Sequence, residues 1–273
     1  MSRRGGELFR LSRLRSIWCP SRPPKNGNPK YRDLCAYKIE VDYQMSSSPR
    51  EYNFPNPRCI RGEFVSLEPI CQVSHAEHLD RHVCGRRNVD LWTYIPFGPF
   101  EKSESLFSLL EHTRKNLGWV SFAICVEGEA KGTISLLRIR REHGSAEVGA
   151  IVLGKELQKT PASTEALYLL TSYVFDHLKY RRLEWKCDDR NIRSKKAAKR
   201  FGFQFEGMFR KDMIVKGQNR NTAWYAMIDT DWRTIKLAYD EWLSPSNFSA
   251  GGRQRRNLKV LIDERLLGFE RRR

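Results

Sequence analysis

Residues 147–210 contain the side chains whose types and order are best suited to chemistry. A strand is predicted over 147–153, and a loop then leads into the start of a helix. A helix start presents unpaired backbone N–H groups and the positive end of the helix dipole, which suits a phosphate. A second strand, at 182–187, leads to another helix start with Asn191 and Ser194. This order suits a long, phosphorylated ligand that lies between two strands.

The first helix start reads QKTPASTEA over 158–166, and the second reads DRNIRSKKAAKRFGF over 189–203. Together with the preceding strand, they resemble the GNAT acyl-CoA N-acyltransferases, specifically the RimJ/RimL-like branch. In that family the phosphate loop is Gln/Arg-x-x-Gly-x-Gly/Ala, and the later helix carries Asn-x-x-Ser…Ala…Gly-Phe. Pro161 replaces the first glycine of the loop and Ser163 the second small residue. One amide donor is lost, because proline has no backbone N–H.

The resemblance covers about 61–243 and implies an α/β GNAT fold. We expect a mixed, mostly antiparallel twisted sheet with a splayed central pair of parallel strands, flanked by helices. The implied reaction moves an acetyl group from the co-substrate acetyl-CoA to a primary amine, by direct attack in a ternary complex. The acceptor is a protein N-terminal α-amine or a small-molecule amine, and the sequence does not choose between them. The altered loop leaves an alternative, a catalytically impaired acyl-CoA-binding GNAT domain.

The resemblance also implies which residues bind the cofactor. In the family, the backbone of the first strand binds the pantetheine arm like an added β-strand. The expected cofactor-binding residues are Ile151, Val152, Leu153, Gln158, Lys159, Thr160, Ala162, Ser163, Thr164, Asn191 and Lys195. The plain alternative for the loop is an ordinary capped helix with Ser163 or Thr164 as its N-cap. For Lys195 the alternative is a solvated helix face.

Three residues are expected to take part in catalysis. Glu147 can accept the amine proton, directly or through water, or attract the cationic amine. Asn191 can cap its helix while its amide meets the pantetheine. Ser194 can donate a proton to the departing thiolate, a tolerable leaving group because a thiol has a pKa near ~8.5. The plain alternatives are a surface carboxylate, an N-cap and a solvated serine. Cys187 is predicted to be packed in the core, so no acyl-enzyme nucleophile is expected.

The segment LWTYIPFGPF at 91–100 is an aromatic, proline-rich loop between two predicted helices. Rigid aromatic side chains at the mouth of a pocket suit recognition of an acceptor. The expected substrate-binding residues are Trp92, Tyr94 and Phe97 in this loop, and Tyr225 on the last strand. The alternative is a packed loop that plugs the core.

Three histidines and two cysteines gather around a predicted helix: His75, His78, His82, Cys71 and Cys84. Imidazole and thiolate are the usual ligands of zinc. Their spacing matches no established zinc pattern, so no metal is expected. The seven cysteines of the chain include no CxxC pair, which favours reduced thiols in an intracellular compartment.

The hydrophobic pattern predicts the elements that must position these residues. Antiparallel strands come first, then a βαβ crossover and a hairpin, which together make a mixed α/β sheet. Strands are expected at 63–69, 119–126, 133–140, 146–153, 182–187, 203–215 and 221–229. Helices are expected at 75–85, 103–117, 163–179, 192–201 and 232–242.

Most of the net charge of +17 lies in two predicted tails. The Pro-rich arm 1–60, expected to be mostly disordered, carries 12 Lys/Arg against 5 Asp/Glu. The tail 244–273 carries 8 against 3 and includes an amphipathic helix at 258–269, whose docking the sequence leaves open. Solvated tails are the plain interpretation, and non-specific nucleic-acid binding through them is the remote alternative.

The remaining expectations concern partners and location. No specific nucleic-acid partner is expected, and no apolar run is long enough to span a membrane. The chain is expected to be a monomer or a homodimer in the cytoplasm. Residues 1–18 interleave arginines with apolar residues and resemble a mitochondrial presequence. A mitochondrial location therefore stands as an alternative.

Overall fold

The computed structural model describes residues 51–56 and 58–270. An eight-stranded sheet runs through this part of the chain in the order β1-β2-β3-β4-β5-β6-β8-β7, and β5–β6 is its parallel pair. The expected fold class is therefore confirmed. The strands are β1 (Ile60–Arg61), β2 (Ser66–Pro69), β3 (Val120–Val126), β4 (Glu129–Arg140), β5 (Ser145–Leu153), β6 (Arg182–Asp188), β7 (Gln204–Val215) and β8 (Gln218–Ile228).

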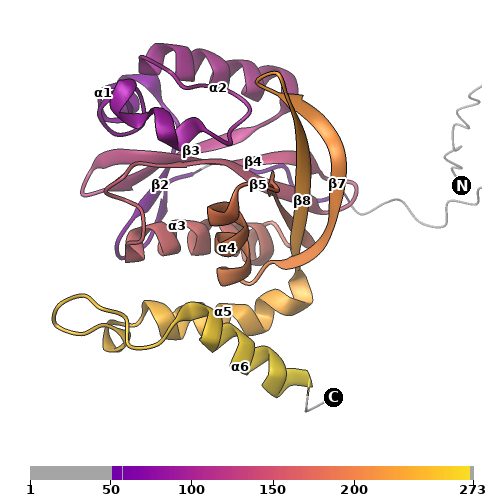
Figure 1. Cartoon of the computed structure of the whole chain (residues 1–273). Helices are drawn as coiled ribbons and strands as arrows, with labels where there is room; N and C mark the ends of the chain where they lie inside the picture. The colour runs from indigo at the N-terminus through magenta and orange to yellow at the C-terminus, as the bar shows by residue number, and fades with distance from the viewer. Residues whose placement is uncertain (1–50, 57, 271–273) are drawn as a thin grey trace, which may run out of the picture. The chain divides into compact units, whose positions relative to one another are not determined.

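Helices cover both faces of this sheet (Figure 1). One face carries α1 and α2, and the other carries α3 and α4, with α5 and α6 beyond them. The long β7–β8 hairpin bends past the edge of the sheet toward the side of α2. The helices are α1 (Gln72–His82), α2 (Ser103–Leu117), α3 (Pro161–Ser172), α4 (Ile192–Arg200), α5 (Asp229–Leu243) and α6 (Leu258–Glu270), and short helical turns lie at Arg86–Trp92, Tyr173–His177 and Pro245–Asn247.

The parallel strands β5 and β6 separate part-way along their length. Their register ends at the pair Val148↔Trp185, although β5 continues to Leu153. On its other side β5 stays paired with β4, through a bulge at which Ala150 has a φ of 48°. The backbone groups of β5 beyond Val148 therefore have no strand partner on the β6 side. They are open to an added chain, as the splayed pair requires.

The two helix starts that flank the separation are capped in different ways. Thr160, and neither Ser163 nor Thr164, is the N-cap of α3: its hydroxyl oxygen accepts the N–H of Ser163 at 3.2 Å. Pro161 is the first residue of the helix, a position where the missing N–H costs nothing. The start of α3 thus lies two residues earlier than predicted. Asn191 is the N-cap of α4, as predicted.

Several other predicted bounds differ from the structure, and two of the differences have a local cause. The helix expected at 75–85 ends at His82, because Gly85 adopts a left-handed φ of 75° that leads into the next helical turn. The strand expected at 63–69 begins only at Ser66. The preceding backbone N–H groups bond to a side chain instead, since the carboxylate of Glu165 accepts those of residues 63, 64 and 65 at 2.9, 2.7 and 3.0 Å.

The predicted tails are partly attached to the body. Residues 51–56 are held by hydrogen bonds to Arg141, Tyr173 and Tyr180. The rest of the arm, with the presequence-like 1–18, lies outside the described residues. Helix α6 docks: its first turns contribute buried apolar side chains to the main core. Arg256 and Arg265 pair with acidic residues of α5 and α6, so part of the tail's basic charge is neutralised internally. Within 51–56 and 58–270, no helix is both long and apolar enough to cross a membrane.

Replacing Glu165 with Gln should lower the free energy of unfolding by about 2–4 kcal/mol. The amide group accepts through one oxygen and directs N–H donors at backbone donors, whereas the carboxylate accepts three N–H bonds. Urea denaturation gives the measurement. The matched control is Glu156→Gln, since Glu156 is exposed and pairs with Lys131 only at 3.5 Å. Equal effects of the two substitutions would contradict the anchoring role.

Candidate active site

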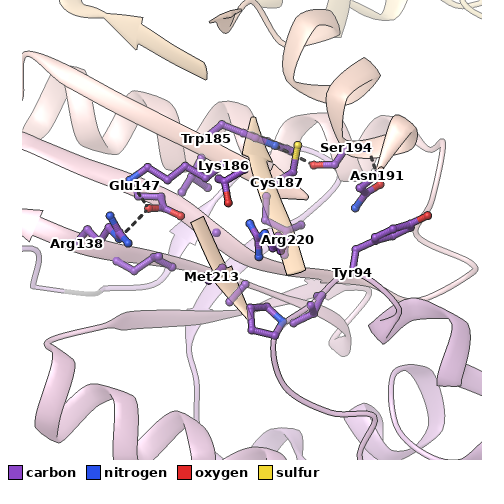
Figure 2. A pocket seen from close by; sticks show the side chains of 18 of the residues that line it. Tyr94, Arg138, Glu147, Trp185, Lys186, Cys187, Asn191, Ser194, Met213 and Arg220 are labelled. Atoms are coloured by element: carbon purple, nitrogen blue, oxygen red, sulfur yellow. Dashed lines mark hydrogen bonds and ion pairs between the residues drawn. The ribbon is translucent and has the colours of Figure 1, made fainter. Parts of the chain in front are cut away.

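A pocket of about 260 Å³ lies where β5 and β6 separate (Figure 2). Side chains alternate between the two faces of a strand, so register decides which residues share a side. Glu147 is paired with Glu184, two residues from Lys186, and these side chains lie on the face away from α3 and α5. Trp185 and Cys187 point to the opposite face. The pocket is lined from both faces and therefore passes between the strands.

Glu147 lies inside this pocket with only 7% of its surface exposed. Its carboxylate is 2.9 Å from Nζ of Lys186 and 3.5 Å from Nε of Arg138. Burial raises the pKa of Glu147, and the two cations partly oppose that rise. The residue is thus a buried, ion-paired carboxylate with enhanced basicity, unlike the surface glutamate of the plain alternative.

Lys186 connects Glu147 to a second buried carboxylate. Its ammonium donates to Glu184 at 2.8 Å and lies 3.7 Å from the centre of the Trp224 ring. Arg140 and Arg182 also donate to Glu184, at 2.6 and 3.0 Å. Burial alone would raise the pKa of Glu184, but the hydrogen bonds from Lys186, Arg182 and Arg140 lower it to about 2. Glu184 therefore stays ionised and holds Lys186 beside Glu147.

Asn191 and Ser194 line the other side of the pocket. Oδ1 of Asn191 accepts the backbone N–H of Ser194 at 3.0 Å, which leaves its amide nitrogen without a hydrogen bond in the described part of the chain. The indole N–H of Trp185 donates to Oγ of Ser194 at 3.0 Å. Because that bond uses an acceptor site of the oxygen, the hydroxyl proton of Ser194 is directed to another acceptor, and the sulfur of Cys187 is within its reach. Ser194 is thus positioned by a tryptophan that the sequence did not single out.

Cys187 is buried, as predicted, although it also lines the pocket. Burial raises the pKa of its thiol, opposed by a hydrogen bond with Ser194 and the charge of Arg220. A protonated thiol is a poor nucleophile.

The expected cofactor residues of β5 and the loop are placed unequally. Ile151 lines the pocket, whereas Val152 is buried in the core under α1 and α2. The carbonyl of Leu153 accepts the side-chain amide of Gln158 at 3.0 Å, so Gln158 holds the loop against the strand. Lys159 is exposed, with a left-handed φ of 62°.

The start of α3 retains fewer free donors than expected. Besides the N–H that Thr160 caps, Ser163 uses its hydroxyl to donate to the carbonyl of Thr160 at 2.8 Å. The backbone N–H groups of Thr160 and Ala162 have no hydrogen-bond partner among the described residues, and at a helix start such groups face outward. Thr164 is buried and accepts from Arg200 at 3.1 Å. Lys195 donates a hydrogen bond from its ammonium group to Asp189 at 2.6 Å. The side chains of Thr164 and Lys195 do not line the pocket.

The expected acceptor residues also divide into two groups. Tyr94 and Phe97 line the pocket. Trp92 is buried, donates its indole N–H to the carbonyl of Val83 at 2.7 Å and packs against Phe97, so it supports the loop from the core. Tyr225 is paired with Trp185 in the sheet and is buried on the same face as that tryptophan, outside the pocket.

A group of three potential metal ligands, Glu68, His75 and Cys125, lies elsewhere in the described residues. This group does not include His78 or His82, the other two histidines around the predicted helix. Nδ1 of His75 accepts the N–H of Cys71 at 3.1 Å, and Nε2 faces Glu68 at 3.4 Å. Burial raises the pKa of Cys125 to about 12, so its thiol is protonated. His75 and Glu68 thus have hydrogen-bond partners within the protein, and Cys125 is a buried thiol beside them.

Comparison with known proteins identifies the architecture. The model of the "Acetyltransferase (GNAT) domain" matches residues 65–204. The chain belongs to the GNAT acetyltransferase family. It is therefore an acyltransferase, and the RimJ structure from Mycobacterium smegmatis shares its fold, at 19% identity and a TM-score of 0.52 over 61% of this chain and 83% of that one.

The putative ribosomal N-acetyltransferase YdaF of Bacillus subtilis is 26% identical over 182 residues, 65% of this chain and 98% of that protein. The spermidine N(1)-acetyltransferase of Escherichia coli K12 is 26% identical over 159 residues, 58% of this chain and 82% of that protein. Among solved structures, a GCN5-related N-acetyltransferase from Brucella melitensis is 35% identical, with a TM-score of 0.74 over 78% of this chain and 98% of that one.

Replacing Glu184 with Gln should destabilise the fold by roughly 3 kcal/mol at pH 7, with the loss confined to the pH range in which the carboxylate is ionised. The pKa of Glu184 in the folded protein, about 2, lies below the ordinary value of 4.5. The stabilisation is therefore complete above about pH 4.5 and disappears as the pH falls toward 2. Unfolding free energies measured from pH 7 to pH 3 should converge for the wild type and the variant. The control is Glu206→Gln, an exposed partner of Arg182; parallel curves for Glu184→Gln and wild type would contradict the role of Glu184.

Proposed function

We propose that this protein transfers the acetyl group of acetyl-CoA to a primary amine by direct attack in a ternary complex. The observation that carries the proposal is the pocket between β5 and β6, which has a basic carboxylate on one face and the hydroxyl of Ser194 on the other. An acceptor and a thioester can thus meet from opposite sides of the sheet. Neither substrate has to be covalently attached to the protein.

The unpaired edge of β5 suits the pantetheine arm, whose amides can bond to the strand as another strand would. Its continuation reaches the start of α3, where the amides of Thr160 and Ala162 and the ammonium of Lys159 suit the pyrophosphate. The free side-chain amide of Asn191 faces the same pocket.

In the proposed reaction the amine nitrogen attacks the thioester carbonyl, so a C–N bond forms and the C–S bond breaks. The amine loses one proton to Glu147, and the thiolate of CoA gains one from Ser194. Solvent then returns a proton to the oxygen of Ser194. Amides of the open β5 edge can stabilise the oxyanion. An α-amine, with a pKa of about 7.7–8.0, is neutral far more often at pH 7 than a lysine amine at about 10.4. An N-terminal α-amine therefore demands less of Glu147.

Substituting Glu for Lys159 should weaken acetyl-CoA binding by roughly fivefold to tenfold. The change places an anion beside the start of α3, where the pyrophosphate is proposed to bind. Isothermal titration of the full chain with acetyl-CoA and CoA gives the dissociation constants. Lys179→Glu is a closely matched control: Lys179 is exposed, has a φ of 59° and lies beyond the opposite end of the same helical segment. It should leave binding unchanged.

No binding at millimolar acetyl-CoA would contradict the proposed site. Acetyl-CoA binding without turnover of any amine would favour the alternative, a catalytically impaired acyl-CoA-binding domain. The occupied donors of Ser163 are the observation on which that alternative rests.

Replacing Glu147 with Gln should lower kcat by about 10²-fold or more at pH 7, because a general base contributes about that much. The wild-type pH profile of kcat/KM should rise as Glu147 loses its proton, at a pKa above the ordinary value of 4.5. In the variant this limb should be absent, while the Kd for acetyl-CoA is retained. Glu142→Gln, on the exposed β4–β5 turn, is the control. An unchanged profile in the Glu147 variant would exclude the role of base.

A further inference from the structure

Arg220 is a buried cation that has no hydrogen-bonded or ion-paired partner among the described residues. Only 7% of its surface is exposed. None of the hydrogen bonds or ion pairs of 51–56 and 58–270 involves its guanidinium, and its Nε is buried without a hydrogen-bond partner. A buried charge without a partner is costly. A site that keeps such a charge is suited to an anion that binds from outside.

The guanidinium lies in the pocket described above (Figure 2). Its strand, β8, pairs with β6 so that Thr222 faces Asp188 and Trp224 faces Lys186. Alternation along β8 therefore places Arg220 on the same face as Lys186 and Glu147. This is the face opposite Trp185, which positions Ser194. Arg220 thus lies on the side assigned to the acceptor and away from the serine assigned to the leaving thiolate.

Thr222 adds a second unused polar group to this place. It lines the pocket two residues after Arg220 on the same face, and its hydroxyl oxygen is buried without a hydrogen-bond partner. A guanidinium and a hydroxyl on the same face of one strand offer several donors to one planar carboxylate. Asp188, the closest acid in the register, uses its oxygens to accept three bonds from Arg190. Burial opposes ionisation of Asp188, but the bonds from Arg190 and the charges of Arg190 and Arg220 lower its pKa, so Asp188 offsets part of the Arg220 charge without bonding to it. Asp212 lines the pocket from exposed β7 and forms no ion pair with Arg220.

The charge balance of the pocket disfavours a polycationic acceptor. Three of its lining residues are cationic, Arg138, Lys186 and Arg220, and two are acidic, Glu147 and Asp212. Glu184, the carboxylate that pairs with Lys186 from outside the pocket lining, also pairs with Arg140 and Arg182. A polyamine would therefore meet a surface with a surplus of positive charge.

We propose that Arg220, assisted by Thr222, binds a carboxylate of the acceptor, so that the substrate is an amine that also carries an acidic group. The amine lies toward Glu147 and the carboxylate toward Arg220. This inference rests on the proposed acetyl transfer and specifies its substrate class.

The test compares acceptors that differ only in one charge. The amidated tripeptides Ala-Asp-Ala and Ala-Glu-Ala are paired with Ala-Asn-Ala and Ala-Gln-Ala, and spermidine serves as the polycation. Release of CoA gives kcat/KM for the wild type and for Arg220→Gln, Arg220→Lys and the control Arg210→Gln, an exposed residue of β7 outside the pocket. The wild type should prefer the acidic peptides by about tenfold or more, because a charged hydrogen-bonded pair contributes that much.

In Arg220→Gln the preference should fall to near parity, through a loss confined to the acidic peptides, and Arg220→Lys should retain part of it. Arg210→Gln should match the wild type. Equal use of acid and amide by the wild type, preference for spermidine, or an equal loss for both peptide types in Arg220→Gln would overturn the inference. The last result would assign the guanidinium to the thioester.

A second measurement separates this inference from the proposed function. The CoA-loaded full chain is titrated with the same peptides, so that acceptor binding is measured without turnover. If acetyl-CoA binds but no amine is acetylated, the proposed acetyl transfer fails. Tighter binding of the acidic peptides that is lost in Arg220→Gln would then still support the carboxylate site, and equal binding of both types would overturn it.

Discussion

The separation of β5 from β6 after Val148 and Trp185 is the constraint on which the site depends. In the middle of a fully paired sheet, the backbone N–H and C=O groups are hydrogen-bonded to neighbouring strands. No backbone donor or acceptor is then left there for a ligand. Here the parallel pair opens while β4 still holds β5 in place through a bulge. The protein thereby exposes a rigid row of amides without creating a flexible edge, and opens a path between the two faces of the sheet.

The same separation brings charge into the centre of the fold. Glu147 and Lys186 lie where the sheet parts, and their burial is tolerated because Glu184 and its arginines complete the charge balance. The arrangement has a chemical consequence. Burial makes Glu147 more basic, whereas the cations Lys186 and Arg138 beside it oppose that rise in pKa. The same surroundings therefore set both the position and the basicity of the carboxylate.

The sequence predicts the sheet and the start of α4 well, because they depend on local signals such as strand alternation and the cap at Asn191, whereas it places the start of α3 two residues too late. It places Glu147 and Ser194 at one pocket through a family resemblance. It does not find Arg220, since the burial of a residue near a hairpin turn depends on how that hairpin bends over the body. Trp185 was missed for a different reason: an apolar residue in a core strand gives no sign that its N–H reaches Ser194. The alternating Glu184, Lys186 and Asp188 in an otherwise apolar strand were a readable signal of charge on one face.

Tyr225 and Trp92 show why aromatic composition alone does not define a binding surface. Both have the right type and lie in the right segments, yet one turns to the face of Trp185 and the other supports its loop from the core. The alternation of side chains along β8 decides where Tyr225 points, and burial in the core decides the role of Trp92. The same alternation places Arg220 and Thr222 on the face of the sheet that carries Glu147, and not on the face of Trp185, which positions Ser194. The acceptor specificity of such a site is then governed by β8, a strand separate from the β5 edge that suits the cofactor. The two substrates can therefore be altered independently.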